Sequence, residues 1–282
     1  MLTIHSQQKS VEGIFGVYSF DIVSFDIGSG VDSEICKPLA LNIKPNYLFT
    51  EKIKTFRSSE KPVILGGGSA GVELALSVIA WKKHFNNVGN VTLISSSPLL
   101  SSYGKAANKK INTIAKEKGL TVYENHYIKE FQQGKLITDQ IVNIDFSYLL
   151  PLTGPSASKL FKQSGLQTDQ SGFMLVNDFL QSVSYPFIFG AGDCVTIEEY
   201  KTLPKNGVYA VRQGPVLWEN IKRKVHGNAL LSFKPQKKFI SILSTGDKSA
   251  LFTYGQINIK GNFAWRLKNK IDTHFIRKHQ RY

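Results

Sequence analysis

Three glycines with the spacing G-x-G-x-x-G provide the first sign of chemistry in this chain. They are Gly66, Gly68 and Gly71, within VILGGGSAGVELALSV at 63–78. The apolar run before them favours a buried parallel strand, and the residues after them favour a helix. A strand, a glycine turn and a helix N-terminus can bind a pyrophosphate, because free backbone N–H groups and the helix dipole face the anion. The pattern therefore predicts a dinucleotide site.

The residues that would bind the ribose of that dinucleotide leave its identity open. NVTLIS at 90–95 predicts the second strand of the unit. Such a strand usually ends in an acid that binds the ribose hydroxyls, but here it ends in Ser95, followed by Ser96 and Ser97. No arginine stands at this position to hold a 2′-phosphate. The sequence does not decide between NADH and NADPH.

A second group of small residues follows another expected strand. In FIFGAGD, the strand at 187–189 leads into Gly190, Gly192 and Asp193. Small residues let a cofactor approach the backbone closely, and the Asp193 carboxylate can accept hydrogen bonds from ribityl hydroxyls. Upstream, FDIVSFDIGSG at 20–30 predicts a further strand that ends in a glycine turn.

Length and composition define the setting of these motifs. The chain has 282 residues, of which 42% are hydrophobic, so it can hold one large domain or two ordinary ones. No apolar run approaches the ~18 residues of a membrane span, and the N-terminus lacks a secretory pattern. Cys36 and Cys194 form no ligand pair and the six histidines are scattered. We expect a reduced, metal-free, cytoplasmic protein.

Positive charge is concentrated at the C-terminus. Residues 222–282 contain 14 Lys+Arg and 2 Asp+Glu, which accounts for most of the net charge of +14. Phe263, Leu267, Ile271 and Phe275 lie four residues apart and would form one helical stripe. One interpretation is an amphipathic helix on an anionic membrane. We favour the other, a helix docked on its own domain with a solvated basic face. A nucleic-acid role is not expected, because no recognised module accompanies the charge.

Taken in order, these segments resemble the FAD-dependent pyridine nucleotide-disulfide oxidoreductases. FDIVSFDIGS is similar to the family's YDYLVLATGS crossover, and FIFGAGD is similar to its later flavin motif. The stretches at 203–222, 233–247 and 265–278 resemble the subgroup related to type II NADH dehydrogenases, whose members also occur fused to selenide, water dikinases.

The resemblance implies an α/β fold of two Rossmann-like domains, with an NAD(P)-binding domain inserted in an FAD-binding domain. The expected parts are a remnant of the FAD-binding domain at 1–58, the NAD(P)-binding domain at 59–153, the second part of the FAD-binding domain at 154–226, and a small basic α+β interface region at 227–282. The family's first G-x-G-x-x-G is missing before FDIVSFDIGS, so we expect an N-terminally truncated FAD domain.

The resemblance also assigns roles near the flavin. Gly28 and Ser29 would lie against the FAD pyrophosphate. Asp193 would bind the ribityl or the pyrophosphate region, with Gly192 giving close access. A helix over 207–225 would begin beneath the flavin, where its positive N-terminal end would stabilise negative charge on the reduced ring.

Two further residues are implied as catalytic. Gln213 would lie beside the isoalloxazine and the acceptor, and Glu73 close to the nicotinamide. Judged from residue type alone, Gln213 is equally a solvated helix residue. Glu73 is equally an acid that favours the first helical turn through the dipole.

The implied activity is electron transfer from NAD(P)H through FAD to an acceptor, with a quinone as the expected substrate. The alternative is a truncated or degenerate flavoprotein that serves as an NAD(P)H-binding or interaction module. A peripheral membrane contact through the basic C-terminus and a homodimer are further expectations. Whether FAD is retained without the first glycine loop is left open.

Overall fold

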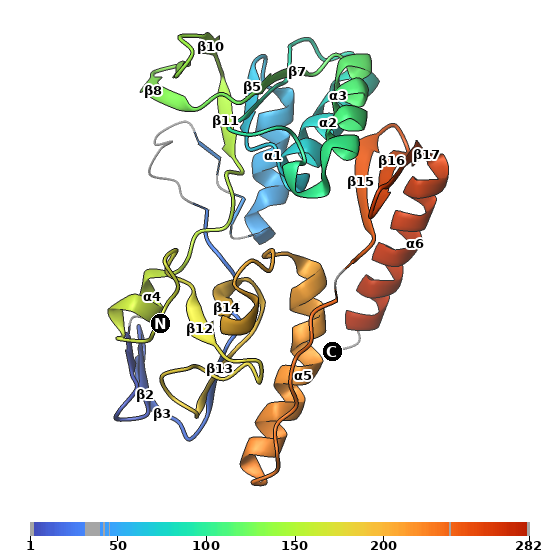
Figure 1. Cartoon of the computed structure of the whole chain (residues 1–282). Helices are drawn as coiled ribbons and strands as arrows, with labels where there is room; N and C mark the ends of the chain where they lie inside the picture. Colours follow the sequence, from blue (N-terminus) through green and yellow to red (C-terminus); the bar gives the residue numbers. More distant parts are fainter. Residues whose placement is uncertain (1–2, 32–39, 42, 45, 237, 281–282) are drawn as a thin grey trace. The chain divides into compact units, whose positions relative to one another are not determined.

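The computed structural model describes residues 3–31, 40–41, 43–44, 46–236 and 238–280 (Figure 1). The chain forms two compact units, and each unit is built from two separate segments. Unit 1 contains residues 1–30 and 155–237, and unit 2 contains residues 31–154 and 238–282. Cys36, for which we expected no ligand pair, lies outside the described residues.

A parallel sheet forms the centre of unit 2. Its strand order is β11-β5-β6-β7. The strands are β5 (Pro62–Leu65), β6 (Thr92–Ser95), β7 (Thr121–Glu124) and β11 (Tyr148–Pro151). All four residues of β5 are buried, as expected for an unbroken apolar strand at the centre of a parallel sheet.

Helices connect and cover these strands. α2 (Ser69–His84) links β5 to β6, α3 (Lys105–Lys118) links β6 to β7, and α1 (Phe49–Ser58) precedes β5. Two short 3-10 helices, η2 (Asn46–Leu48) and η3 (Ser101–Tyr103), precede α1 and α3. Between β7 and β11 the chain forms a small antiparallel sheet of β8 (Ile128–Gln132), β9 (Lys135–Thr138) and β10 (Asn143–Asp145).

The C-terminal segment completes unit 2. β15 (Ser241–Gly246), β16 (Ser249–Tyr254) and β17 (Ile257–Gly261) form an antiparallel sheet beside α2 (Figure 1). Leu243 and Leu251 pack in the same core as Ile64 of β5. Gly246 has φ +75°, and a Cβ there would lie 2.5 Å from the Cβ of Ala80. Only glycine therefore lets β15 approach α2 this closely.

The last helix, α6 (Asn262–His279), docks mainly through its first turns. Ala264 is buried, whereas three members of the expected apolar stripe are 72% (Phe263), 49% (Ile271) and 43% (Phe275) exposed. The expected docking on its own domain therefore leaves much of the stripe uncovered. Among the described residues, no helix is both long enough and apolar enough to cross a membrane.

Unit 1 is assembled from short strands and two α-helices. The strands are β1 (Thr3–His5), β2 (Ser10–Gly13), β3 (Gly16–Ser19), β4 (Val23–Phe25), β12 (Met174–Val176), β13 (Ile188–Gly190) and β14 (Val195–Ile197). The α-helices are α4 (Lys159–Gln163) and α5 (Gly207–Val225), with 3-10 turns η4 (Gly192–Cys194) and η5 (Glu198–Tyr200). β1–β3 form an antiparallel meander, while β4 pairs with β13 and β12 with β14 in parallel.

The observed units divide the chain differently from the expected domain bounds. Residues 31–58, which we expected in the remnant of the FAD-binding domain, belong to unit 2, as do residues 238–282. The physical reason is shared packing: Phe56 of α1, Leu76 of α2 and Leu243 of β15 lie in one hydrophobic cluster.

Candidate functional site

The predicted glycine loop joins β5 to α2 in unit 2. Gly66 has φ +118°, and its N–H donates to the Ile94 carbonyl at 2.8 Å. A Cβ at Gly66 would collide with the Leu152 carbonyl oxygen, and one at Gly71 would collide with the Gly66 carbonyl oxygen. These two glycines are therefore required by the close packing of helix, loop and strand.

Gly68 differs from its neighbours because its surroundings are open. A Cβ there would meet no atom within 4 Å, although Gly68 is the N-cap of α2. Having no side chain, Gly68 cannot cap the helix, so the first-turn N–H groups of α2 depend on another acceptor. Open space in front of an uncapped helix N-terminus fits the pyrophosphate of a dinucleotide.

At the end of β6, the Ser95 hydroxyl is bonded to the backbone of Ser97. Ser95 is 3% exposed, and its Oγ donates to the Ser97 carbonyl at 2.6 Å. Opposite Ser95 in the parallel register lies Glu124, the last residue of β7. The acidic residue Glu124 therefore lies beside Ser95, the position at which the sequence has no acid to bind a ribose.

Glu73 lies on α2, beside the C-terminal segment of unit 2. Its Oε1 accepts the Ser244 N–H at 2.9 Å and lies 3.5 Å from Nζ of Lys268. Burial lowers the pKa of Lys268, but Glu73 and Asp272 together outweigh that effect and raise it. The placement of Glu73 near a nicotinamide stays a prediction. The structure adds that Glu73 is bonded to β15 through Ser244 and to α6 through Lys268.

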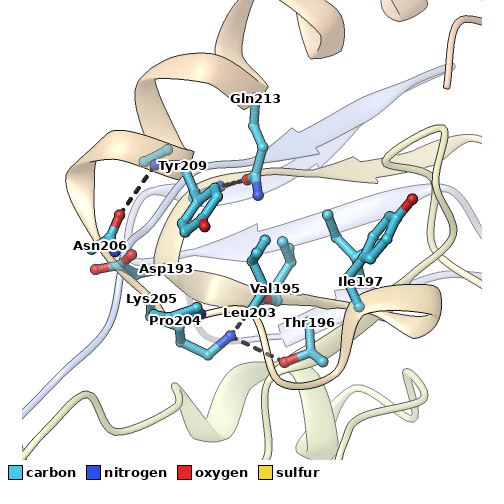
Figure 2. A pocket seen from close by; sticks show the side chains of 13 residues that line it. Asp193, Val195, Thr196, Ile197, Leu203, Pro204, Lys205, Asn206, Tyr209 and Gln213 are labelled. Atoms are coloured by element: carbon cyan, nitrogen blue, oxygen red, sulfur yellow. Dashed lines mark hydrogen bonds between the residues drawn. The ribbon is translucent and has the colours of Figure 1, made fainter. Parts of the chain in front are cut away.

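Unit 1 contains a small cavity at the N-terminal end of α5 (Figure 2). Its lining includes Gly192, Asp193, Thr196, Lys205, Asn206, Tyr209 and Gln213. Its volume is about 20 Å³, so it could receive one polar group or one water, and a larger ligand would lie across its mouth.

This cavity brings together three residues predicted at the flavin. Gly192 and Asp193 follow β13, and Gln213 enters from α5 (Figure 2). The Gly192 N–H donates to Oε1 of Gln213 at 2.6 Å, and Gln213 is only 4% exposed. Gln213 is therefore not the solvated helix residue that its type alone allowed.

Gly28 lies on the neighbouring turn after β4. Gly28 has φ +62°, and its amide lies near the Cys194 thiol, as does that of Ile27. Burial raises the pKa of that thiol more strongly than the two amides lower it. Ser29, the second residue predicted at the pyrophosphate, is 8% exposed.

A partly buried lysine connects the loop before α5 to β14. Nζ of Lys205 donates to the Val195 carbonyl and to Oγ1 of Thr196 at 3.0 Å, and lies 3.8 Å from the ring centroid of Phe173. Burial lowers the pKa of Lys205, opposed by the charge of Asp169 and nearby acids. The lysine therefore holds the start of α5 against β14.

Sequence reasoning missed Lys205 and Asn206. Asn206 caps α5, because its Oδ1 accepts the N–H groups of Val208 and Tyr209 at 3.1 and 3.2 Å. An asparagine just before a predicted helix is an N-cap signal that could have revealed this role. Lys205 carries no such signal, since its partners are a backbone carbonyl and a hydroxyl from another element.

Comparison with known proteins identifies a family model and several relatives. The model described as pyridine nucleotide-disulphide oxidoreductase matches residues 31–214. Ferroptosis suppressor protein 1 of Xenopus tropicalis is 24% identical over 224 residues, covering 73% of this chain and 55% of the relative. The type II NADH:quinone oxidoreductase of Haemophilus influenzae is 26% identical over 219 residues, covering 71% and 49%. The chain thus spans about half the length of these curated relatives.

Solved structures agree on the fold. A sulfide:quinone oxidoreductase from Aquifex aeolicus has a TM-score of 0.78 at 18% identity, covering 98% of this chain and 73% of that one. An NAD-dependent persulfide reductase from A. fulgidus has a TM-score of 0.71 at 18% identity, covering 89% and 48%. The expected α/β fold with Rossmann-like domains is confirmed.

Proposed function

The chain belongs to the pyridine nucleotide-disulphide oxidoreductase family, and from this we propose that it passes electrons from NAD(P)H through FAD to a quinone. The observation that carries the proposal is the loop between β5 and α2. Gly66 and Gly71 are required there by packing, whereas Gly68 faces open space at an uncapped helix N-terminus. This combination suits the pyrophosphate of a nicotinamide dinucleotide.

The residues of unit 1 fit a flavin in their chemistry. Gly28 and Ser29 would lie at the FAD pyrophosphate, and Gly192 and Asp193 at the ribityl chain. Gly192 has φ +73°, and a Cβ there would come within 2.7 Å of Oδ1 of Asp26, while Asp193 lines the cavity beside it. When bound, FAD would supply hydride acceptance and electron release.

The remaining groups of this site would orient the flavin and stabilise its charge. The N-terminus of α5, fixed by the Asn206 cap, would favour negative charge at the pyrimidine edge. Gln213 would hold the Gly192 turn in place beside the ring. In unit 2, Glu73 would lie close to the nicotinamide.

We propose a quinone as the electron acceptor because two similar proteins have a quinone in their names. These are the type II NADH:quinone oxidoreductase and the sulfide:quinone oxidoreductase. A quinone in a bilayer calls for a membrane contact, and we propose that the basic α6, with its exposed Phe263 and Phe275, provides it. Hydride transfer depends mainly on the positions of the cofactors, so no acid–base pair is required.

A second candidate function is an NAD(P)H-binding module without flavin. It is favoured by the sheets of unit 1, because β4 pairs only with β13 among the described strands. Two-stranded sheets are marginal on their own, so unit 1 would gain from further pairing before it could hold a large cofactor.

The first experiment is the visible absorption spectrum of the purified chain, with and without added FAD. Flavin absorption that survives desalting and bleaches on adding NADH or NADPH would support the reductase. Protein that stays colourless when FAD is supplied, yet binds ADP-ribose, would favour the binding module.

A glycine variant tests the nucleotide site directly. Gly68→Ala should fold with an unchanged melting temperature, because the new Cβ meets open space. It should raise the Kd for ADP-ribose about tenfold or more, because the methyl group would occupy the path of the pyrophosphate. The control is Gly261→Ala, at the extended N-cap glycine of α6, whose added Cβ also meets no atom within 4 Å and lies outside the loop. Equal binding by Gly68→Ala and wild type would contradict the proposed site.

A further inference from the structure

We propose that Glu124 is a positioning residue for the phosphate loop, acting through residues 97–100. The inference rests on the proposed nucleotide site. Glu124 ends β7, directly opposite Ser95 at the end of β6. It does not touch the glycine loop itself, but it holds the segment that does.

Three N–H donors converge on one carboxylate oxygen. Oε1 of Glu124 accepts the Leu99 N–H, Nδ2 of Asn108 at 2.7 Å and Nδ2 of Asn112 at 3.1 Å. The amide group of Asn108 also donates to the Leu99 carbonyl at 3.0 Å. Both peptide groups of Leu99 are thereby fixed to β7 and α3. Hydrogen bonds to an ionised acceptor are the stronger class, so this is a firm attachment.

The next residue passes this attachment on to the loop. The Leu100 N–H donates to the Gly67 carbonyl at 2.9 Å. The side chain of Leu99 lies directly over Gly67, because a Cβ there would come 2.8 Å from Cδ2 of Leu99. A chain of contacts therefore runs from Glu124 through Leu99 and Leu100 to the carbonyl of Gly67, in the middle of the glycine loop.

The backbone at Leu100 shows that this segment must be held. Leu100 has φ +52°, a left-handed conformation that is unfavourable for leucine, and it is 1% exposed. Such a conformation persists only where its surroundings fix it. Without the Glu124 acceptor, three donors would lose their partner and Leu100 could relax, which would move the Gly67 carbonyl. The direction of the loop N–H groups toward a pyrophosphate would change with it.

The test compares Glu124→Ala and Glu124→Gln with two controls. Gln keeps an oxygen acceptor without the charge, so it should rescue in part. Glu117→Gln changes an acid on α3 that pairs with Lys260. Ile114→Val trims a buried side chain on the same helix, so it lowers stability without touching the loop.

Two readouts are measured on the full chain: the Kd for ADP-ribose by calorimetry and the amide exchange of Leu100 by NMR. Glu124→Ala should weaken binding about tenfold, as expected for a displaced hydrogen-bonding loop, and speed up Leu100 exchange. Glu124→Gln should fall between Glu124→Ala and wild type. Both controls should keep the wild-type Kd. Exchange of Leu93 in β6 reports any loss of global stability, and in Glu124→Ala the exchange of Leu100 should speed up by a larger factor than that of Leu93.

Each other outcome is decisive. Unchanged Leu100 exchange in Glu124→Ala would overturn the proposal, as would faster exchange with unchanged ADP-ribose binding. Equal weakening by Ile114→Val would assign the effect to general stability and would also overturn it. If wild type binds no ADP-ribose, the nucleotide function fails, whereas Leu100 exchange still decides whether Glu124 holds the loop.

Discussion

The backbone N–H of Gly192 donates to Oε1 of Gln213 at 2.6 Å, which ties the turn after β13 to the second turn of α5. Gln213 is the acceptor for a turn with a left-handed glycine, so its amide has a structural task in addition to the role proposed beside the flavin.

Replacing Gln213 by leucine should therefore destabilise unit 1. The Gly192 N–H would lose its acceptor, at a cost of about 1–3 kcal/mol in the free energy of unfolding. Urea unfolding followed by circular dichroism measures the change. Gln213→Glu, which keeps an oxygen acceptor, should lose less. Arg212→Ala, on the exposed side of α5, should stay within about 0.5 kcal/mol of wild type.

Lys82 gives unit 2 a predicted pH dependence. It is 3% exposed, and its Nζ donates to the carbonyls of Ser59 and Val88 and to Oδ1 of Asn87. Burial lowers its pKa below the ordinary 10.5, opposed in part by Glu60. At pH values between the pKa of Lys82 in the folded chain and 10.5, the unfolded chain binds more protons than the folded chain. Lys82 therefore makes the free energy of unfolding rise with pH in that window.

The measurement for Lys82 is the unfolding free energy of wild type and Lys82→Met across that pH window. The difference, wild type minus variant, should increase as the pH rises toward 10.5. Lys82→Met should also be less stable at pH 7 by about 1–3 kcal/mol, because the carbonyls lose their donor. Lys83→Met, on the exposed side of the same helix, is the matched control. A difference that is flat with pH would show that the Lys82 pKa is not lowered.

Glu73→Gln separates the two roles discussed for this acid. Gln can still accept the Ser244 N–H, so the lost ion pair with Lys268 should cost at most about 1 kcal/mol. If the carboxylate lies near the nicotinamide, the variant should change the Kd for NADH and leave that for ADP-ribose unaltered. Isothermal calorimetry with both ligands gives the comparison. Equal changes in the Kd values for NADH and ADP-ribose would show that the Glu73 carboxylate does not lie near the nicotinamide.

Vesicle sedimentation tests the membrane contact of α6. Wild type should bind vesicles that contain phosphatidylserine, and should bind less as salt is raised, because the cations of α6 face anionic headgroups. Phe263→Ser combined with Phe275→Ser should weaken binding, since both rings are exposed in the structure. Val88→Ser, an exposed apolar change outside α6, should not. Full binding by the double variant would exclude the α6 stripe as the contact.

The sequence predicted the local elements because their signals are local. The apolar run at 63–65 lies in β5, the helix over 207–225 is α5, and the spacing from Phe263 to Phe275 lies in α6. In the region expected to be a small basic α+β part, 227–282, β16 and β17 form a hairpin turned at Gly255 with φ +58°.

Long-range contacts could not be predicted in the same way. Glu124 receives donors from residues 12 to 25 positions away, and Glu73 receives the Ser244 N–H across 171 positions. Nothing in the type of either residue indicates those partners. They arise because β7 lies beside β6 and β15 packs along α2, and both arrangements depend on tertiary structure.

The two-segment construction of unit 2 determines how the nucleotide module can be isolated. A fragment of residues 59–153 would keep the glycine loop but would leave Leu76 and Ala80 facing water, where Gly246 and its strand now lie. Such a fragment should aggregate through that apolar surface of α2. Joining residues 31–154 to 238–282 through a short flexible linker, which keeps Phe56, Leu76 and Leu243 in their shared core, should restore a folded nucleotide binder.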